Sequence, residues 1–525
     1  MANLQLARAT GRTSEIAIRA AMGASRGRIV AQVLTESVMV SILGGLLGLG
    51  LAFAGAKVLM ATIPPNVHPM NEDFMDFGVL AFTGAVAILT GIVSGLAPAF
   101  QISRVSVNET LKEGGRAGTG GARGRLRGVF VVAEVSLAMV LLLAAGLLIK
   151  SFNLLLEVNP GFRVESLLTA RIWLPNAKYA TPELRAQFFR DLVERAGGIP
   201  GAQSAAASTN IPMTGGGSGT NFAVEGQPAP VAGHEPIGRV RSITPGYFQT
   251  IGIPLVRGRY FTEQDDAGAQ RVVIINERMA QQFFANQDPI GKRVKWNRDP
   301  ASSAPWLTIV GVAGNIVGVA GNVKPYGLAS QPVLEMFAPA NQEPSAFMFI
   351  LVRTAAADAA SMAAPLRAEL RNLDRDQPMN GVQSMQQIVE DTMIVSKYMT
   401  ILTAIFAGIA LMMAAMGIYG VISYTVAQRT RELGIRMALG AGSANVVRLV
   451  LTQALWVVGI GIGIGVPGAA AVTRVLQSYL YGVGPRDPAT FVLIPAVLAG
   501  VALVASYVPA RRATRVDPMI ALRYE

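Results

Sequence analysis

Six long apolar segments recur along a chain that is otherwise mixed in polarity. Each is long enough, at roughly 20 residues, to cross the hydrocarbon core of a bilayer. Charged residues are rare within them, so the pattern predicts transmembrane helices rather than helices of a soluble core. The segments are 29–60, 79–102, 129–149, 398–427, 446–480 and 491–508.

The region 152–397, between the third and fourth apolar segments, has the patterning of a folded domain. Short β-branched and aromatic runs predict strands, and stretches of helical periodicity predict helices. The predicted strands are 167–173, 271–275, 306–312 and 347–352, and the predicted helices are 182–196 and 359–373. We therefore expect a polytopic α-helical membrane protein, with about six transmembrane helices and a large extracytoplasmic α+β domain of two subdomains.

Composition and charge support this class. Of the 525 residues, 51% are apolar and only 15% are charged, whereas soluble chains usually carry about 25% charged residues. The net charge of +12 could suggest nucleic acid, but region 152–397 is nearly balanced, with 22 basic and 21 acidic residues. The excess of positive charge lies next to the apolar segments, so we expect no nucleic acid partner.

The basic residues also predict the topology. Most of those outside region 152–397 fall in stretches 1–28, 104–127, 429–448 and 511–523. Short cytoplasmic loops carry such an excess of Lys and Arg. We expect both termini and the Gly/Arg-rich linker in the cytoplasm, with region 152–397 outside. We expect no cleavable signal peptide in residues 1–28, because they lack an apolar core.

One sequence block occurs twice. Residues 12–24 (RTSEIAIRAAMGA) reappear as 429–441 (RTRELGIRMALGA), each just before a long apolar segment. A second, partial repeat relates residues 98–111 to residues 509–522. Such a repeat indicates a duplicated membrane module. On a helix, Glu432 and Arg436 would share one face and could pair, and Gly440 could end that helix.

Three further motifs carry a resemblance to a known family. Segments Phe248–Asp265, Val273–Glu277 and Asp288–Arg293 resemble the periplasmic core domain of MacB-type ABC transporter permeases. The basic repeat resembles the FtsX-like permease domain of the same superfamily. The two-half layout is similar to the duplicated MacB-like permeases abundant in acidobacteria. By this resemblance the first half lacks a span and an outer domain, so we expect an N-terminally truncated chain.

The resemblance implies a division into domains. They are a cytoplasmic coupling segment (1–28), two spans (29–103), a cytoplasmic linker (104–128), one span (129–151), the periplasmic core domain (152–397) and an FtsX-like domain with three spans (398–525). It also implies that the repeated basic block is a coupling helix for an ATPase. The candidate coupling residues are Glu15, Arg19, Gly23, Arg429, Glu432, Arg436 and Gly440.

Enzymatic sites are not predicted. No stretch fits the phosphate loop Gly-x-x-x-x-Gly-Lys-Ser/Thr. The two histidines, His68 and His234, lie in no metal-binding or catalytic spacing, and there are no cysteines. We expect both histidines on surface loops, and the carboxylates of Asp265 and Asp266 in solvated turns. No metal or cofactor is expected in this chain, and ATP and Mg²⁺ would belong to the partner ATPase.

The resulting hypothesis is a permease subunit in a bacterial inner membrane that works with a separate ABC ATPase. It would transmit ATP-driven motion to the outer domain for efflux or release of a periplasmic substrate. A homodimer or pseudo-dimer, and a periplasmic adaptor, are left open as partners besides the lipid bilayer. One alternative is an ATPase-independent scaffold or signalling protein. Another is a proton-coupled secondary transporter that uses Glu36 or Glu134, which lie inside predicted spans.

Overall fold

The computed structural model divides into two compact units. One comprises Phe152–Tyr398, and the other comprises Met1–Ser151 together with Met399–Glu525. We call them the outer unit and the membrane unit. The structure describes residues 22, 25–62, 76–103, 120–214, 219–227, 236–285, 287–296, 304–314, 333–439 and 442–514.

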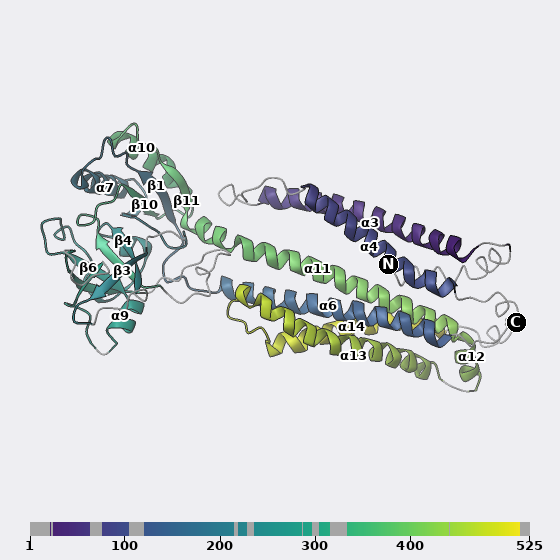
Figure 1. Cartoon of the computed structure of the whole chain (residues 1–525). Helices are drawn as coiled ribbons and strands as arrows, with labels where there is room; N and C mark the ends of the chain where they lie inside the picture. The colour runs from purple at the N-terminus through teal and green to yellow at the C-terminus, as the bar shows by residue number, and fades with distance from the viewer. Residues whose placement is uncertain are drawn as a thin grey trace. The chain divides into compact units, whose positions relative to one another are not determined.

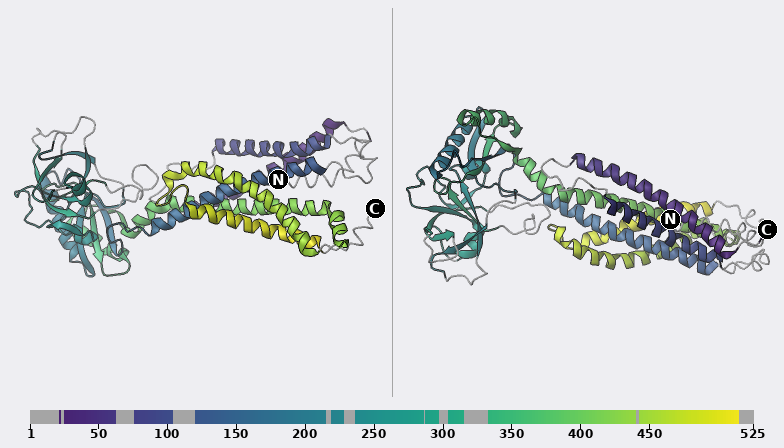
Figure 2. Two further views of the ribbon diagram at one scale, coloured as in Figure 1. Left: turned by 90° about the horizontal axis from the view of Figure 1, so that it is seen from below. Right: turned by 45° about the horizontal axis from the view of Figure 1, so that its top comes forward.

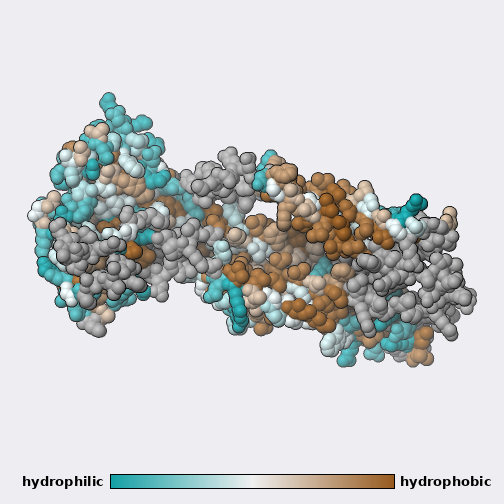
Figure 3. Space-filling view, in the orientation of Figure 1, coloured by the Kyte–Doolittle hydropathy of each residue, from teal (hydrophilic) through white to brown (hydrophobic). Residues whose placement is uncertain are grey.

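The six predicted spans are confirmed as long apolar helices among the described residues. They are α3 (Arg26–Thr62), α4 (Phe77–Ser103), α6 (Gly120–Leu156), α11 (Met385–Gln428), α13 (Ser443–Leu476) and α14 (Pro488–Ala513). Apolar side chains cover their outer surfaces, as Figure 3 shows for one face. A surface this apolar is suited to lipid and would be unstable in water.

Two of these helices begin well before the predicted residues. Helix α6 begins at Gly120, so residues 120–128 of the predicted linker 104–128 belong to the helix. Helix α11 begins at Met385, so the predicted junction between residues 397 and 398 lies inside a helix. Hydropathy marks only the part of a helix that lies in lipid. Once formed, a helix extends at little cost into polar sequence, which carries no hydropathy signal.

Four helices of the membrane unit share one hydrophobic core. It joins Val135 and Met139 of α6 to Ala414 of α11, Val458 of α13 and Leu498 of α14. Figures 1 and 2 show these helices side by side along most of their length. Small residues let them approach closely. Ser136 of α6, for example, donates a hydrogen bond through Oγ to the Gly461 carbonyl at 2.9 Å.

Helices α3 and α4 pack against each other as a pair. A Cβ placed on Gly91 of α4 would lie 2.8 Å from Cα of Val38, and one on Gly95 would lie 2.9 Å from Cβ of Ser37. The contact on α3 continues at Gly45, which faces Ala87. The absence of side chains at these three positions therefore brings the two backbones together.

The outer unit contains one continuous sheet of mixed pairing. Four antiparallel strands, in the order β11-β1-β10-β2, form an open half. The remaining order, β4-β3-β7-β8-β6-β9, closes into a barrel because β9 pairs back with β4. Ser208 on β2 and Ile243 on β4 are the register pair that joins the halves. The strands are β1 (Leu167–Trp173), β2 (Ala202–Ser208), β3 (Gly219–Val224), β4 (Ile237–Ile243), β5 (Leu255–Gly258, paired with β8), β6 (Val272–Asn276), β7 (Arg293–Trp296), β8 (Leu307–Ala313), β9 (Glu335–Pro339), β10 (Phe347–Thr354) and β11 (Asn380–Ser384).

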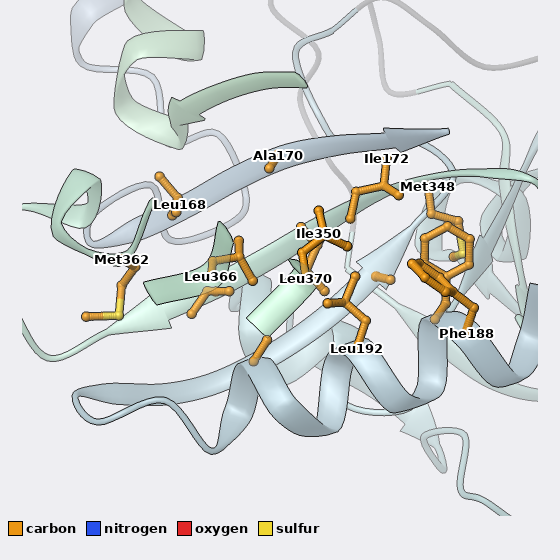
Figure 4. Packing of buried hydrophobic residues seen from close by; sticks show 14 of the residues in the cluster. Leu168, Ala170, Ile172, Phe188, Leu192, Met348, Ile350, Met362, Leu366 and Leu370 are labelled. Carbon is orange, nitrogen blue, oxygen red and sulfur yellow. The ribbon is translucent and has the colours of Figure 1, made fainter. Parts of the chain in front are cut away.

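Each half has its own hydrophobic core. In the open half, α7 (Pro182–Gly197), the 3-10 turn η2 (Ala359–Met362) and α10 (Ala363–Leu373) cover one face of the sheet. There Leu192 and Leu366 meet Leu168 and Ile350 (Figure 4). Inside the barrel, residues such as Phe222, with α9 (Glu277–Phe283), form the second core. All four predicted strands and both predicted helices are present, displaced by at most two residues at their ends.

Candidate functional site

The second copy of the repeated basic block forms a short helix between two spans. This helix, α12 (Thr430–Ala438), follows α11 after a break at Arg429, whose φ and ψ are −101° and 13°. It ends at Ala438 and is capped by Leu439, and Gly442 then takes an extended conformation as the residue before α13. The two breaks allow α12 to run in its own direction between α11 and α13.

The predicted pair between Glu432 and Arg436 is present. Arg436 Nη2 lies 2.6 Å from Glu432 Oε1, and Arg429 Nε lies 4.0 Å from Glu432 Oε2. All three side chains are about half exposed. An exposed pair of this kind stabilises a helix by only about 0.3–0.5 kcal/mol. Glu432 in the first turn and Arg436 in the last also suit the helix dipole.

One side of α12 packs against the ends of the neighbouring helices. Gly434 is buried, and Met437 contacts a small cluster with Val426 of α11 and Val446 of α13. Arg429 also donates a hydrogen bond to Oε1 of Gln453 on α13 at 3.4 Å. The orientation of α12 on the bundle is therefore set by apolar packing and by one polar contact.

The other side of α12 faces away from the bundle. Glu432, Ile435, Arg436 and Leu439 are spaced i, i+3, i+4 and i+7, which places them on one helical face. Ile435 is 41% exposed and Leu439 is 83% exposed. Two apolar side chains beside an ion pair are suited to contact with protein. We call these four residues the α12 face.

Sequence reasoning missed the apolar part of this face. It selected Glu432 and Arg436 as coupling residues and did not select Ile435 and Leu439, although Ile435 also repeats, as Ile18 in the first copy. Their spacing from Glu432 was a usable signal once the helix bounds were known. The candidate residues Glu15, Arg19, Gly23 and Gly440 lie outside the described residues.

The opposite end of the four-helix core is tied by polar contacts. Lys150 Nζ, in the second half of α6, lies 2.8 Å from Asp487 Oδ1, and Asp487 also accepts a hydrogen bond from the Thr490 N–H at the start of α14. Ser151 Oγ accepts a hydrogen bond from the Tyr481 N–H at 2.7 Å. Hydrogen bonds from Lys150 and Thr490 lower the pKa of Asp487 to about 2. The α13–α14 loop is thus attached to α6.

The family motifs in the outer unit have structural roles. Gly258 has a φ of +84°, and a Cβ there would lie 2.7 Å from Cα of Gly311, so only glycine fits. Arg259 then donates two hydrogen bonds to Asp265, at 2.7 and 2.8 Å. The prediction that Asp265 is solvated is wrong: its side chain is buried, and the hydrogen bonds from Arg259 lower its pKa. Asp266 is exposed, as predicted.

A buried polar cluster lies where the two halves of the outer unit meet. Arg241 on β4 donates to Oε1 of Glu335 on β9 at 2.5 Å and to the Asn210 carbonyl at 3.3 Å. On the other half, Arg353 of β10 donates to backbone carbonyls, including that of Thr250 in α8 (Tyr247–Ile251) at 2.7 Å. A buried charge that loses its hydrogen-bond partners costs free energy. Any rearrangement that separates these arginines from their partners is therefore unfavourable, which favours a single arrangement of the junction.

Little in the described residues suggests catalysis. No group of three or more His, Asp or Glu residues that could hold a metal ion occurs among them. The histidines His68 and His234 lie outside the described residues. Glu134 of α6 is packed against Gly417 of α11, where its carboxylate fills the space that a side chain would need. Glu36 of α3 accepts a hydrogen bond from Gln32 at 3.2 Å.

Comparison with known proteins assigns the family. The model of the MacB-like periplasmic core domain matches residues 77–372, more than half of the chain, and the model of the FtsX-like permease C-terminal region matches 1–107 and 404–518. The uncharacterized ABC transporter permease YknZ of Bacillus subtilis is 29% identical over 298 residues, which cover 54% of this chain and 70% of YknZ. The macrolide export ATP-binding/permease protein MacB of Neisseria meningitidis is 28% identical over 279 residues, which cover 53% of this chain and 42% of MacB.

The solved periplasmic region of MacB from Actinobacillus actinomycetemcomitans matches with a TM-score of 0.30 and 16% identity, covering 44% of this chain and 93% of that chain. The family models account for both units, since the FtsX-like match falls on helices of the membrane unit and the core-domain match includes most of the outer unit. The chain belongs to the MacB/FtsX-like permeases of ABC transporters, and it is a multi-pass bacterial membrane protein.

Proposed function

We propose that this permease is the membrane subunit of an ATP-driven machine whose ATPase is a separate polypeptide. The ATPase docks on the α12 face. Its closure on ATP displaces α12, and the motion passes through the spans to the outer unit. The outer unit then moves or releases a substrate on the periplasmic side of a bacterial inner membrane.

The continuity of α11 is the observation that supports this proposal best. Helix α11 runs for 44 residues without a break, which corresponds to about 66 Å at 1.5 Å per residue. It directly follows β11 of the outer unit and ends one residue before α12. A hydrogen-bonded helix resists bending far more than a loop does. A displacement of α12 would therefore also displace the sheet.

Two observations support a partner ATPase. The chain carries no phosphate loop, and the MacB relative combines an ATP-binding part and a permease part in one longer protein. The match covers less than half of that protein. We therefore place ATP and Mg²⁺ on the partner, and the termini of this chain on the same cytoplasmic side as that partner.

Charge reversal on the α12 face tests the proposal. Arg436→Glu should reduce the ATPase activity that copurifies with the tagged chain from native membranes by several-fold, at unchanged membrane abundance. Arg448→Glu is the matched control. Arg448 lies in the same basic stretch and is exposed on α13, outside the α12 face, so it should leave copurification unchanged. If the basic stretch only anchors α12 to lipid headgroups, both charge reversals will have the same small effect. That outcome would favour the scaffold alternative over the coupling proposal.

The secondary-transporter alternative makes a different prediction. The purified chain in liposomes, without any ATPase, would take up substrate when a proton gradient is applied, and Glu134→Gln would stop the uptake. The coupling proposal expects no gradient-driven uptake.

A further inference from the structure

Two residues near the junction of the outer unit have a strained backbone. Among the described residues, Ser166 and Met213 are the non-glycine residues with a positive φ, at 52° and 73°. In this region the Cβ of an L-residue crowds its own backbone. Such a conformation persists only where surrounding contacts hold it, and it is found most often at sites that switch.

Ser166 lies in a segment that is bonded to both halves of the sheet. The Arg163 N–H donates to the Ile251 carbonyl at the end of α8 at 3.0 Å, and α8 follows barrel strand β4 in the chain. Arg353 of β10, in the open half, donates to the Glu165 carbonyl at 2.6 Å. The strained segment is therefore held from both sides of the junction.

Met213 follows a loop that is bonded to both halves in a similar way. The Asn210 carbonyl of this loop accepts a hydrogen bond from Ser208 Oγ of β2 at 2.6 Å and another from Arg241 of β4 at 3.3 Å. The next residue, Thr214, donates through Oγ1 to Asn210 Oδ1 at 2.7 Å. Both strained residues thus belong to segments that join the open half to the barrel.

Buried polar atoms that lack a hydrogen bond gather at the same junction. In the part of the chain that the structure describes, they include Arg241 Nε, Glu335 Oε2 and Thr250 Oγ1, from β4, β9 and α8. Tyr247 lies beside the Arg241–Glu335 pair, and its hydroxyl makes no hydrogen bond of normal geometry either. A polar atom that is removed from water and left unpaired costs free energy, and each such atom in a native fold calls for an explanation.

The two halves also share little of the sheet. Strands β2 and β4 meet at one register pair, whereas β1 and β10 within the open half share seven, and β4 and β9 within the barrel share five. The two hydrophobic cores have no buried residue in common. The halves can therefore part at β2 and β4 while each keeps its core.

Two sets of contributions oppose each other at the junction. The hydrogen bonds of Arg241 and Arg353 favour the arrangement seen, whereas the strain and the unpaired atoms disfavour it. Each set consists of a few contributions of the same order. Separation of β2 from β4 would relax the strain and admit water to the unpaired atoms. It would keep the Arg241–Glu335 bond, because both residues belong to the barrel.

We propose that the β2–β4 junction is a joint with two arrangements, the closed one of this structure and an open one in which β2 and β4 separate. In the open arrangement Ser166 and Met213 relax, and water pairs with Arg241 Nε and Glu335 Oε2. Packed interfaces of this kind switch between discrete arrangements rather than deform gradually. The joint needs no ATPase, so its test is independent of the proposed coupling.

Spin-label distances in the full-length chain, held in phospholipid nanodiscs, test the joint, since the chain has no cysteine of its own. Gln187→Cys on α7 and Gln281→Cys on α9 report across the junction, and both positions are exposed. Gln187→Cys with Ala368→Cys on α10 is the matched pair within the open half (Figure 1). The cross-junction pair should give two distances and the matched pair one. A single distance across the junction would overturn the proposal.

Two sets of variants should shift the populations. Ser166→Gly removes the strain of the closed arrangement, because glycine adopts a positive φ freely, and should reduce the open population at least several-fold. Ser166→Ala is the control: it loses the same hydroxyl, keeps the strain and should leave both populations unchanged. Arg241→Met with Glu335→Leu replaces the pair by apolar side chains, as buried sites often allow, and should also abolish the second distance.

The matched pair shows whether each variant is folded, since its single distance should not change. If the double variant loses that distance, the comparison at Ser166 decides. Equal open populations in Ser166→Gly and Ser166→Ala would mean that the joint stores no strain, and would overturn the proposal. A second distance that survives in a folded double variant would do the same.

Discussion

At the scale of single residues, buried carboxylates stabilise the outer unit, and one of them, Asp265, was predicted from the sequence to be solvated. Asp265 is buried and receives two hydrogen bonds from Arg259 and one from the Thr262 N–H. Asp374 is also buried, and although burial alone would raise its pKa, hydrogen bonds from Lys178 and Tyr179 lower it. Carboxylates of this kind stabilise the fold only while they are ionised.

Removing the charge of Asp265 should therefore weaken the outer unit. In the isolated fragment 152–398, which we expect to fold alone because it has its own cores, Asp265→Asn should lower the free energy of unfolding at pH 7 by about 1–3 kcal/mol. The folded-state pKa of Asp265 is lowered, so the stabilisation is present above the unfolded pKa of about 3.9 and is lost as pH falls below it. Denaturant unfolding at pH 7, 5 and 3 should show the gap between wild type and Asp265→Asn narrowing at pH 3, because the stabilisation is lost as pH falls from the unfolded pKa through the lowered folded-state pKa. Asp266→Asn is the control and should change little, and a gap as large at pH 3 as at pH 7 would contradict this account.

At the scale of elements, small residues decide which helix faces meet. Gly461 and Gly465 are buried against α6, whereas Gly459 and Gly463 of the same helix have no described atom within 4 Å of their Cβ positions. The sequence has glycine at four alternate positions, 459, 461, 463 and 465, and this spacing is equally compatible with packing within the bundle and with packing between chains. The structure assigns Gly461 and Gly465 to the bundle.

Filling one of these positions should separate the helices. Gly461→Leu forces a side chain into Val135 and should destabilise the membrane unit by about 1–3 kcal/mol, seen as a lower melting temperature in detergent. Gly463→Leu adds the same atoms to the same helix on its open side and should leave the melting temperature nearly unchanged. If the two variants melt alike, the α6–α13 contact is not as close as the structure shows.

At the scale of the whole molecule, the charge pattern predicts a topology with the outer unit on one side of the membrane and α12 on the other. Gln203 in the outer unit and Ser443 at the start of α13 are both exposed. In intact spheroplasts, an impermeant thiol reagent should label Gln203→Cys and should label Ser443→Cys only after lysis. Labelling of Ser443→Cys but not Gln203→Cys before lysis would invert the topology.

The sequence by itself determined the membrane class, the six spans, the repeat, four strands of the outer unit and the pair between Glu432 and Arg436. These features depend on local periodicity, on composition or on neighbours within one helical turn, and a linear pattern contains all of them. Only the tertiary structure decided that β9 closes a barrel by pairing with β4, that Arg259 buries Asp265, and that Gly461 meets Val135. Each of those contacts brings together segments that lie apart in the chain or on different elements. Their partners are chosen by packing in three dimensions, and hydropathy along the chain carries no record of that choice.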